Sequence, residues 1–291
     1  ARHGIVVTLT TAIALVVAIG LTVLGAGATE TAVANFDATS WLWSSSRGEV
    51  DRVNGITARV DTRTRIKDAQ NHEIDISQTD AYLILRDLDT GQVSALDLTT
   101  LQISAVMPTT PGLGVSVALY GETAFVIDSV QGQVRQLDPR SLAPTGDAIA
   151  LPNGITPGDF DGRGTLWIAV PTEGTVVAIA SGANGANPRV LRTIPVAAPG
   201  HDLELSSLDD GVAVLDNTDQ ALLIVRGDRV ESTAVRLDKP ALLPGRTDGS
   251  SLPITFAASE GPPSLQVAPD RHRWEERRLG KECDLMCRSR W

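Results

Sequence analysis

Cysteine is almost absent from this chain of 291 residues, because both cysteines, Cys283 and Cys287, lie among the last nine positions. A disulfide framework is therefore excluded for residues 1–282. No histidine and no second cysteine pair follows the Cys-x-x-x-Cys spacing, so it lacks the ligands that complete a tetrahedral zinc site. We expect neither a metal nor another cofactor.

Aromatic residues and lysine are also scarce. Aromatic side chains make up 4% of the chain, so Val, Ile, Leu and Ala must fill the core. Lysine occurs only three times, and the net charge is −10. Binding to a phosphate backbone needs clustered Lys and Arg, so this composition argues against a nucleic-acid partner.

Charged residues are missing from a run of 25 positions, Gly4–Ala28. About 20 apolar residues in a helix span a bilayer core, and Arg2 before the run predicts a cytoplasmic N-terminus. We therefore expect residues 1–3 to form a cytoplasmic stub and residues 4–28 a single-pass signal-anchor in the cell membrane. The alternative is a cleaved signal peptide ending near Ala32-Val33-Ala34. Both interpretations place the bulk of the chain outside the cytoplasm.

Five segments repeat one pattern, an apolar strand, a turn and a second strand. The turn positions are separated by 43, 41, 42 and 46 residues, and they are Gly48, Gly91, Gly132, Gly174 and Gln220. This period matches a four-stranded propeller blade, and the alternation of apolar and polar residues excludes helical repeats. The sequence predicts an all-β fold, a β-propeller of about five four-stranded blades over residues 29–250. The four glycines are interpreted as structural turn residues.

The segment after the five repeats has two parts. Residues 251–269 are predicted to start a further blade and then break off, so we expect the ring to be incomplete as given. From about Asp270 the alternation stops, and residues 270–291 resemble the conceptual translation of a sequencing adapter. We expect this segment to be non-native or disordered and to contribute nothing to the fold. A basic, solvated tail is the alternative.

Two motifs carry a family resemblance. Ser40-Trp41-Leu42-Trp43 near the N-terminal apolar run, followed by Asp87-Leu88-Asp89-Thr90-Gly91, resembles actinobacterial membrane-anchored proteins named for fibronectin type III domains. The resemblance implies a propeller-like ectodomain, although no fibronectin module is present in this sequence. More distantly, residues 160–169 resemble the repeat of virginiamycin B lyase-type propellers.

Few residues qualify as a chemical site. His72-Glu73 and His201 with Glu204 are weak catalytic candidates, because histidine and carboxylate can act as acid and base. Asp159 to Gly164 looks like a calcium loop, but Arg163 stands where an EF-hand needs an oxygen ligand, so we interpret it as a turn. No nucleophile-elbow or zinc-protease motif occurs.

The sequence thus favours a binding or scaffold module over an enzyme. The expected partners are the membrane, through the N-terminal helix, and a protein or cell-wall ligand. The alternative is a propeller-type lyase or hydrolase acting at the central axis. That alternative requires His72, Glu73, His201 and Glu204 to converge there.

Overall fold

The computed structural model describes residues 39–183, 186–237, 239–245 and 252–256, and the backbone of 264–267 and 277–278. These residues form strands and turns. Among them, no helix is long and apolar enough to cross a membrane. The predicted signal-anchor, residues 4–28, lies outside the described residues.

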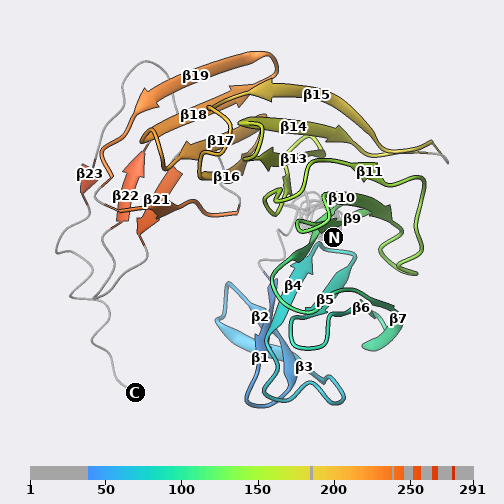
Figure 1. Cartoon of the computed structure of the whole chain (residues 1–291). Coiled ribbons are helices and arrows are strands. Elements are labelled where there is room, and N and C mark those ends of the chain that lie inside the picture. Colours follow the sequence, from blue (N-terminus) through green and yellow to red (C-terminus); the bar gives the residue numbers. More distant parts are fainter. Residues whose placement is uncertain are drawn as a thin grey trace, which may run out of the picture. The chain divides into compact units, whose positions relative to one another are not determined.

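The strands form six antiparallel sheets in which each strand pairs with the next one along the chain (Figure 1). Sheet 1 has three strands, β1 (Thr39–Ser44), β2 (Glu49–Asn54) and β3 (Arg59–Arg65). The other sheets have four strands each. Sheet 2 contains β4 (Ile74–Gln78), β5 (Leu83–Asp87), β6 (Gln92–Asp97) and β7 (Gln102–Pro108). Sheet 3 contains β8 (Val115–Tyr120), β9 (Thr123–Asp128), β10 (Gln133–Leu137) and β11 (Ile149–Ala150).

The three remaining sheets repeat the same order. Sheet 4 contains β12 (Asp159–Phe160), β13 (Thr165–Val170), β14 (Thr175–Ala180) and β15 (Arg189–Pro195). Sheet 5 contains β16 (Leu203–Leu208), β17 (Gly211–Asp216), β18 (Ala221–Arg226) and β19 (Arg229–Ala234). Sheet 6 contains β20 (Ala241–Leu242), β21 (Leu252–Phe256), β22 (Ser264–Val267) and β23 (Arg277–Arg278). This order of antiparallel strands is the one predicted for propeller blades.

The described residues divide into two compact units. One unit holds residues 39–42 and 51–63, and in it Arg63 lies 3.8 Å from Asp51. The other unit holds residues 43–50 and everything from Thr64 onward, so it contains sheets 2 to 6 complete.

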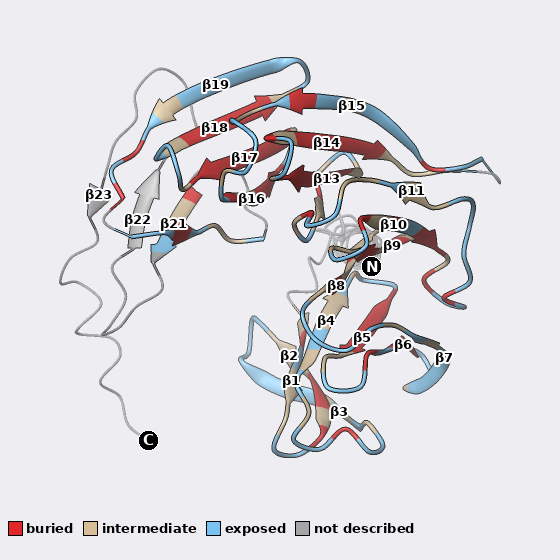
Figure 2. Cartoon of the chain, viewed as in Figure 1, coloured by how far each residue is buried: buried red, intermediate tan, exposed pale blue. Residues whose placement is uncertain are grey.

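Within the larger unit, each sheet packs against the next one because successive side chains of a strand point to opposite faces. In sheet 4, Leu166 and Ile168 pack on Phe125 of sheet 3, whereas Trp167 and Ala169 pack on sheet 5. Further apolar clusters join sheets 2 and 3 and sheets 5 and 6. Burial accordingly concentrates in the central strands, and β15 and β19 are largely exposed (Figure 2).

The repeat's turn positions all adopt a left-handed backbone. Gly91 has φ of 76° and Gly132 has φ of 66°, and Gln220, which replaces glycine in the fifth repeat, has φ of 53°. At Gly132 the backbone of another segment also comes close, because the Leu151 N–H donates to the Gly132 carbonyl over 2.7 Å. A Cβ on Gly132 would lie 2.1 Å from the Leu151 carbonyl oxygen, so no side chain fits there without a backbone shift.

Sheet 6 differs from the prediction. The described residues form six sheets, whereas the sequence predicted about five blades and the start of another, and the first strand of the sixth sheet is Ala241–Leu242. Its first strand is only two residues long, too short to show alternation. The last strand, Arg277–Arg278, pairs with Leu265 and Gln266 and falls in the segment expected to contribute nothing to the fold. That expectation about residues 270–291 stays a prediction.

Replacing Gly132 tests the close approach separately from the backbone conformation. Gly154 also has positive φ, at 79°, but a Cβ there would meet nothing within 4 Å, so it is the matched control. We expect Gly132→Ala to lower the free energy of unfolding by about 1 kcal/mol or more beyond the effect of Gly154→Ala. Denaturant unfolding of both variants measures the difference, and equal losses would contradict the close approach.

Candidate functional site

His72, the first predicted candidate, lies in the loop that leads into β4. Its Nδ1 is 2.7 Å from Oδ2 of Asp87, the last residue of β5. The other oxygen of Asp87 accepts hydrogen bonds from the backbone N–H groups of Asp89 and Thr90, 2.9 and 3.1 Å away. The pair therefore joins the loop before the first strand of sheet 2 to the turn between its second and third strands. We call this arrangement the His–Asp clamp.

The second candidate histidine occupies the same position in sheet 5. His201 Nδ1 lies 2.7 Å from Oδ2 of Asp216, the last residue of β17, and the separation along the chain is 15 residues in both sheets. Oδ1 of Asp216 accepts from the N–H groups of Thr218 and Asp219. The two predicted histidine sites are thus two copies of one clamp, and each copy belongs to its own sheet.

The hydrogen bonds of the clamps shift the pKa values of both histidines and of Asp87. The hydrogen bond to Asp87 is the main reason why the pKa of His72 is raised, and Asp216 has the same effect on the pKa of His201. Burial tends to raise the pKa of Asp87, but the hydrogen bonds from His72 and Thr90 outweigh it, so that pKa is lowered. Both shifts favour the ion pair of imidazolium and carboxylate.

A third carboxylate accompanies each clamp. Asp89 stands beside His72 and Asp87, Asp219 stands beside His201 and Asp216, and within each group the potential ligand atoms lie within 4.8 Å of one another. Both oxygens of Asp87 and of Asp216 already have hydrogen-bond partners, and Asp89 Oδ2 accepts from the Glu73 N–H over 2.7 Å. A cation at either group would compete with these N–H donors. The contacts fit a clamp that fixes turns better than a metal site.

The two predicted glutamates play no part in the clamps. Glu73 is exposed and contributes only through its backbone, because its N–H donates to Asp89 and its carbonyl accepts from the Leu88 N–H. Glu204 is half-buried on β16, and burial, followed by the charge of Asp202, raises its pKa. Because Leu203 and Leu205 pack on sheet 4, the alternation directs Glu204 to the opposite face of sheet 5. The described residues therefore place the four candidates in two separate groups rather than in one site.

The predicted turn at Asp159–Gly164 is present between β12 and β13. Oδ1 of Asp161 accepts from the N–H groups of Arg163 and Thr165, and Oδ2 accepts from the Trp167 indole over 2.9 Å. These N–H donors occupy both oxygens of the carboxylate that a calcium ion would need. Of the two tryptophans in the quoted motif, Trp41 is buried, and Trp43 donates from its indole to the His72 carbonyl over 2.9 Å.

Sequence reasoning missed the aspartate partners of both histidines. The signal was available, because His72 and Asp87 recur as His201 and Asp216 with the same separation. It also missed Arg86, which is 2% exposed and donates from Nη2 to the carbonyls of Thr110 and Gly112. Nothing in its sequence context distinguishes Arg86 from an exposed arginine, so only the fold reveals it.

Comparison with solved structures identifies the fold class of the chain. No family model and no curated protein matches the chain. Among solved structures, a streptogramin B lyase aligns with a TM-score of 0.61 and 10% identity, over 85% of this chain and 82% of that one. Hsv2 from Kluyveromyces marxianus aligns with a TM-score of 0.57 and 9% identity, over 84% and 81%. A chain of the mitotic checkpoint complex gives 0.59 and 9%, over 79% and 71%.

These structures are β-propeller proteins, and the described part of the chain has a β-propeller fold. Sheets 1 to 6 are therefore blades in the sense of the sequence prediction. At such low identity the likeness concerns the fold alone, because one fold hosts many unrelated functions.

The clamps predict a pH dependence of stability. Since the pKa of His201 is raised on folding, its contribution is complete below the unfolded value of 6.5 and is lost as pH rises through the folded pKa. We expect His201→Ala to lower the melting temperature more at pH 5.5 than at pH 9. His72→Ala should behave in the same way, because His72 occupies the same position in sheet 2. Thermal unfolding at both pH values tests this, and equal losses would contradict the ion pair.

Proposed function

We propose that this chain is a membrane-anchored, extracytoplasmic propeller that works as a binding or scaffold module and not as an enzyme. The observation that carries the proposal is the use of His72 and His201 in clamps with Asp87 and Asp216. A general acid or base must reach a substrate proton. Each histidine is held by a carboxylate 2.7 Å from its Nδ1, an arrangement that orients Nε2, and the two histidines belong to different blades, so they do not form one acid–base set.

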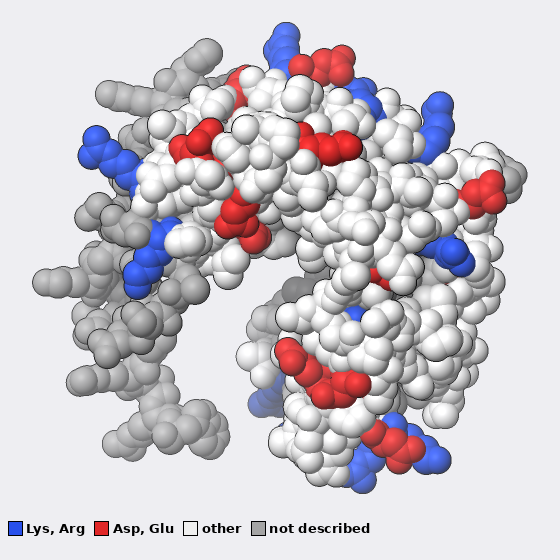
Figure 3. Space-filling view, viewed as in Figure 1, with Lys and Arg blue, Asp and Glu red and all other residues white. Residues whose placement is uncertain are grey.

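The surface supports the same proposal. On the face shown in Figure 3, acidic and basic side chains lie singly or in small groups among uncharged ones. The aspartate-capped turns hold the loops at the blade ends in fixed conformations, as the turns after Asp87 and Asp216 show. Fixed loops on a rigid scaffold are a common way to present a binding surface, because little conformational entropy is lost on binding.

A lyase acting at the propeller axis is the second candidate. It is favoured by the fold likeness to the streptogramin B lyase, with a TM-score of 0.61. The likeness, at 10% identity, concerns the fold, and the four candidate residues form two separate groups among the described residues. Fold-level analogy alone is weak support for an activity.

One experiment separates the two candidates. The purified full-length chain is incubated with isolated bacterial cell envelope and, in parallel, with a streptogramin B antibiotic. We expect saturable co-sedimentation with the envelope, unchanged by His201→Ala at pH 7 and 20 °C, and no conversion of the antibiotic to a product that liquid chromatography separates from it. Protease treatment of the envelope tells a protein ligand, whose binding it abolishes, from a cell-wall ligand.

Conversion of the antibiotic that disappears in His201→Ala would overturn the proposal in favour of the lyase. Absence of saturable envelope binding would also count against it. Recovery of the chain in the membrane fraction of expressing cells checks the anchor separately, and a fully soluble chain would contradict the signal-anchor.

A further inference from the structure

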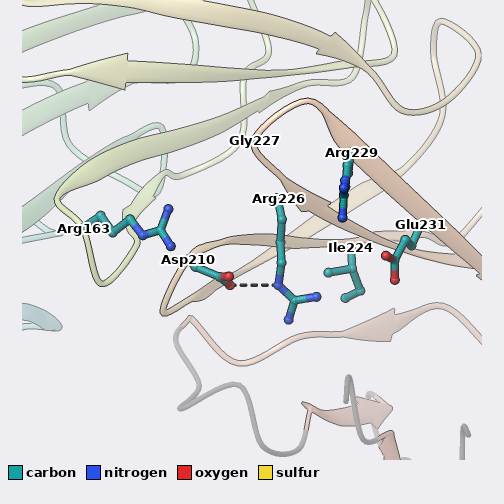
Figure 4. A pocket seen from close by; sticks show the side chains of 7 residues that line it. All are labelled: Arg163, Asp210, Ile224, Arg226, Gly227, Arg229 and Glu231. Carbon is teal, nitrogen blue, oxygen red and sulfur yellow. Dashed lines mark hydrogen bonds and ion pairs between the residues drawn. The ribbon is translucent and has the colours of Figure 1, made fainter. Parts of the chain in front are cut away.

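A pocket of about 350 Å³ opens at the end of blade 5 opposite the His–Asp clamp. The clamp lies where β16 begins and β17 ends, and the pocket lies where β16 ends and β18 turns into β19. Its main lining residues are Arg163, Asp210, Ile224, Arg226, Arg229 and Glu231. Figure 4 shows Arg163 on the turn of the neighbouring blade, with its guanidinium directed towards Asp210. Two blades therefore contribute to one pocket.

The strand register explains why charged side chains converge here. Arg226 is paired with Arg229 across the hairpin, and Ile224 is paired with Glu231. Directly paired residues share a face of an antiparallel sheet, as do residues two apart along a strand. All four side chains consequently lie on the same face of β18 and β19. Two arginines directly opposite each other repel, so this pairing costs stability in the absence of a counter-charge.

Only part of that counter-charge is supplied by the chain. Arg226 Nε donates to Asp210 Oδ1 over 2.8 Å. Among the described residues, neither Arg163 nor Arg229 has a side-chain hydrogen bond or ion pair. With three arginines and two carboxylates, the pocket carries a net charge of +1, in a chain whose net charge is −10. A local excess of positive charge on an acidic protein is the feature that needs explanation.

We propose that this pocket binds an oxyanion, a phosphate or carboxylate group carried by a small ligand. The planar guanidinium fork matches the oxygen geometry of both groups and donates two parallel hydrogen bonds to either. Ile224 lines the floor of the pocket and belongs to the apolar cluster between sheets 5 and 6. The volume lies at the lower end of the range for small-molecule sites. Arg163 and Arg229 are the anion-binding residues, and Asp210 positions Arg226.

This inference names a ligand class for the proposed binding module and rests on that function. The probes are phenyl phosphate and benzoate, which share a ring and differ in the anionic group, with benzyl alcohol as the uncharged control. Isothermal titration of the full-length chain should show one saturable site for at least one of the anions and none for the alcohol. Comparing the two affinities decides whether the group is a phosphate or a carboxylate.

Substitutions locate the site. We expect Arg229→Ala and Arg163→Ala each to weaken binding about tenfold or more, since a hydrogen-bonded charge pair is lost. Arg229→Lys should restore part of the affinity, because it keeps the charge without the fork. Arg135→Ala, an exposed arginine on β10 outside the pocket, is the matched control and should bind like the wild type. Unchanged circular dichroism in each variant excludes loss of the fold.

The result that would overturn the site is no saturable binding of either anion, or binding that Arg229→Ala and Arg163→Ala leave unchanged. Failure of anion binding can be told apart from failure of the proposed function, because envelope binding is measured in a separate experiment. If envelope binding persists without anion binding, the proposed binding function is retained, and this pocket is rejected as its ligand site.

Discussion

Packing between successive sheets is the constraint on which the rest of this structure depends. Each central strand has apolar side chains on both faces, so no sheet can bury its surface alone. Val212 and Val214 face sheet 4, and Ala213 and Leu215, on the same strand, face sheet 6. Stability in such an array comes from the interfaces between neighbours. Some loop residues, such as Ile155 and Leu237, belong to these interfaces, and the exposed remainder of the loops is open to binding functions.

The same constraint explains how much of the fold could be predicted. The turn positions at intervals near 42 residues reflect a backbone requirement, a left-handed residue at each second hairpin, and such a requirement is visible in sequence. Gln220 shows that the requirement concerns the backbone and not the residue type, since it adopts φ of 53° without being glycine. The start of blade 6 was hard to place from the sequence, because its first strand has two residues and carries no periodic signal.

The site was less predictable than the fold. His72 and His201 were selected as acid–base candidates, but their partners Asp87 and Asp216 lie 15 residues further on and are brought together only by the antiparallel pairing of the first two strands of each blade. The arginine pocket had no sequence signal at all. Arg163 is 63 residues from Arg226, and their proximity depends on the packing of sheet 4 on sheet 5. The repeat period predicts the strands within each blade, but it does not predict which side chains of different blades come into contact.

The most direct test of this account is native-state hydrogen exchange on Leu166→Ala. Leu166 is fully buried on β13, in the cluster between sheets 3 and 4. If the sheets depend on their neighbours, the substitution should speed amide exchange in β9 of sheet 3 as well as in β13 itself. Exchange that accelerates in sheet 4 alone, with β9 as protected as in the wild type, would contradict the claim that packing between sheets holds the fold together.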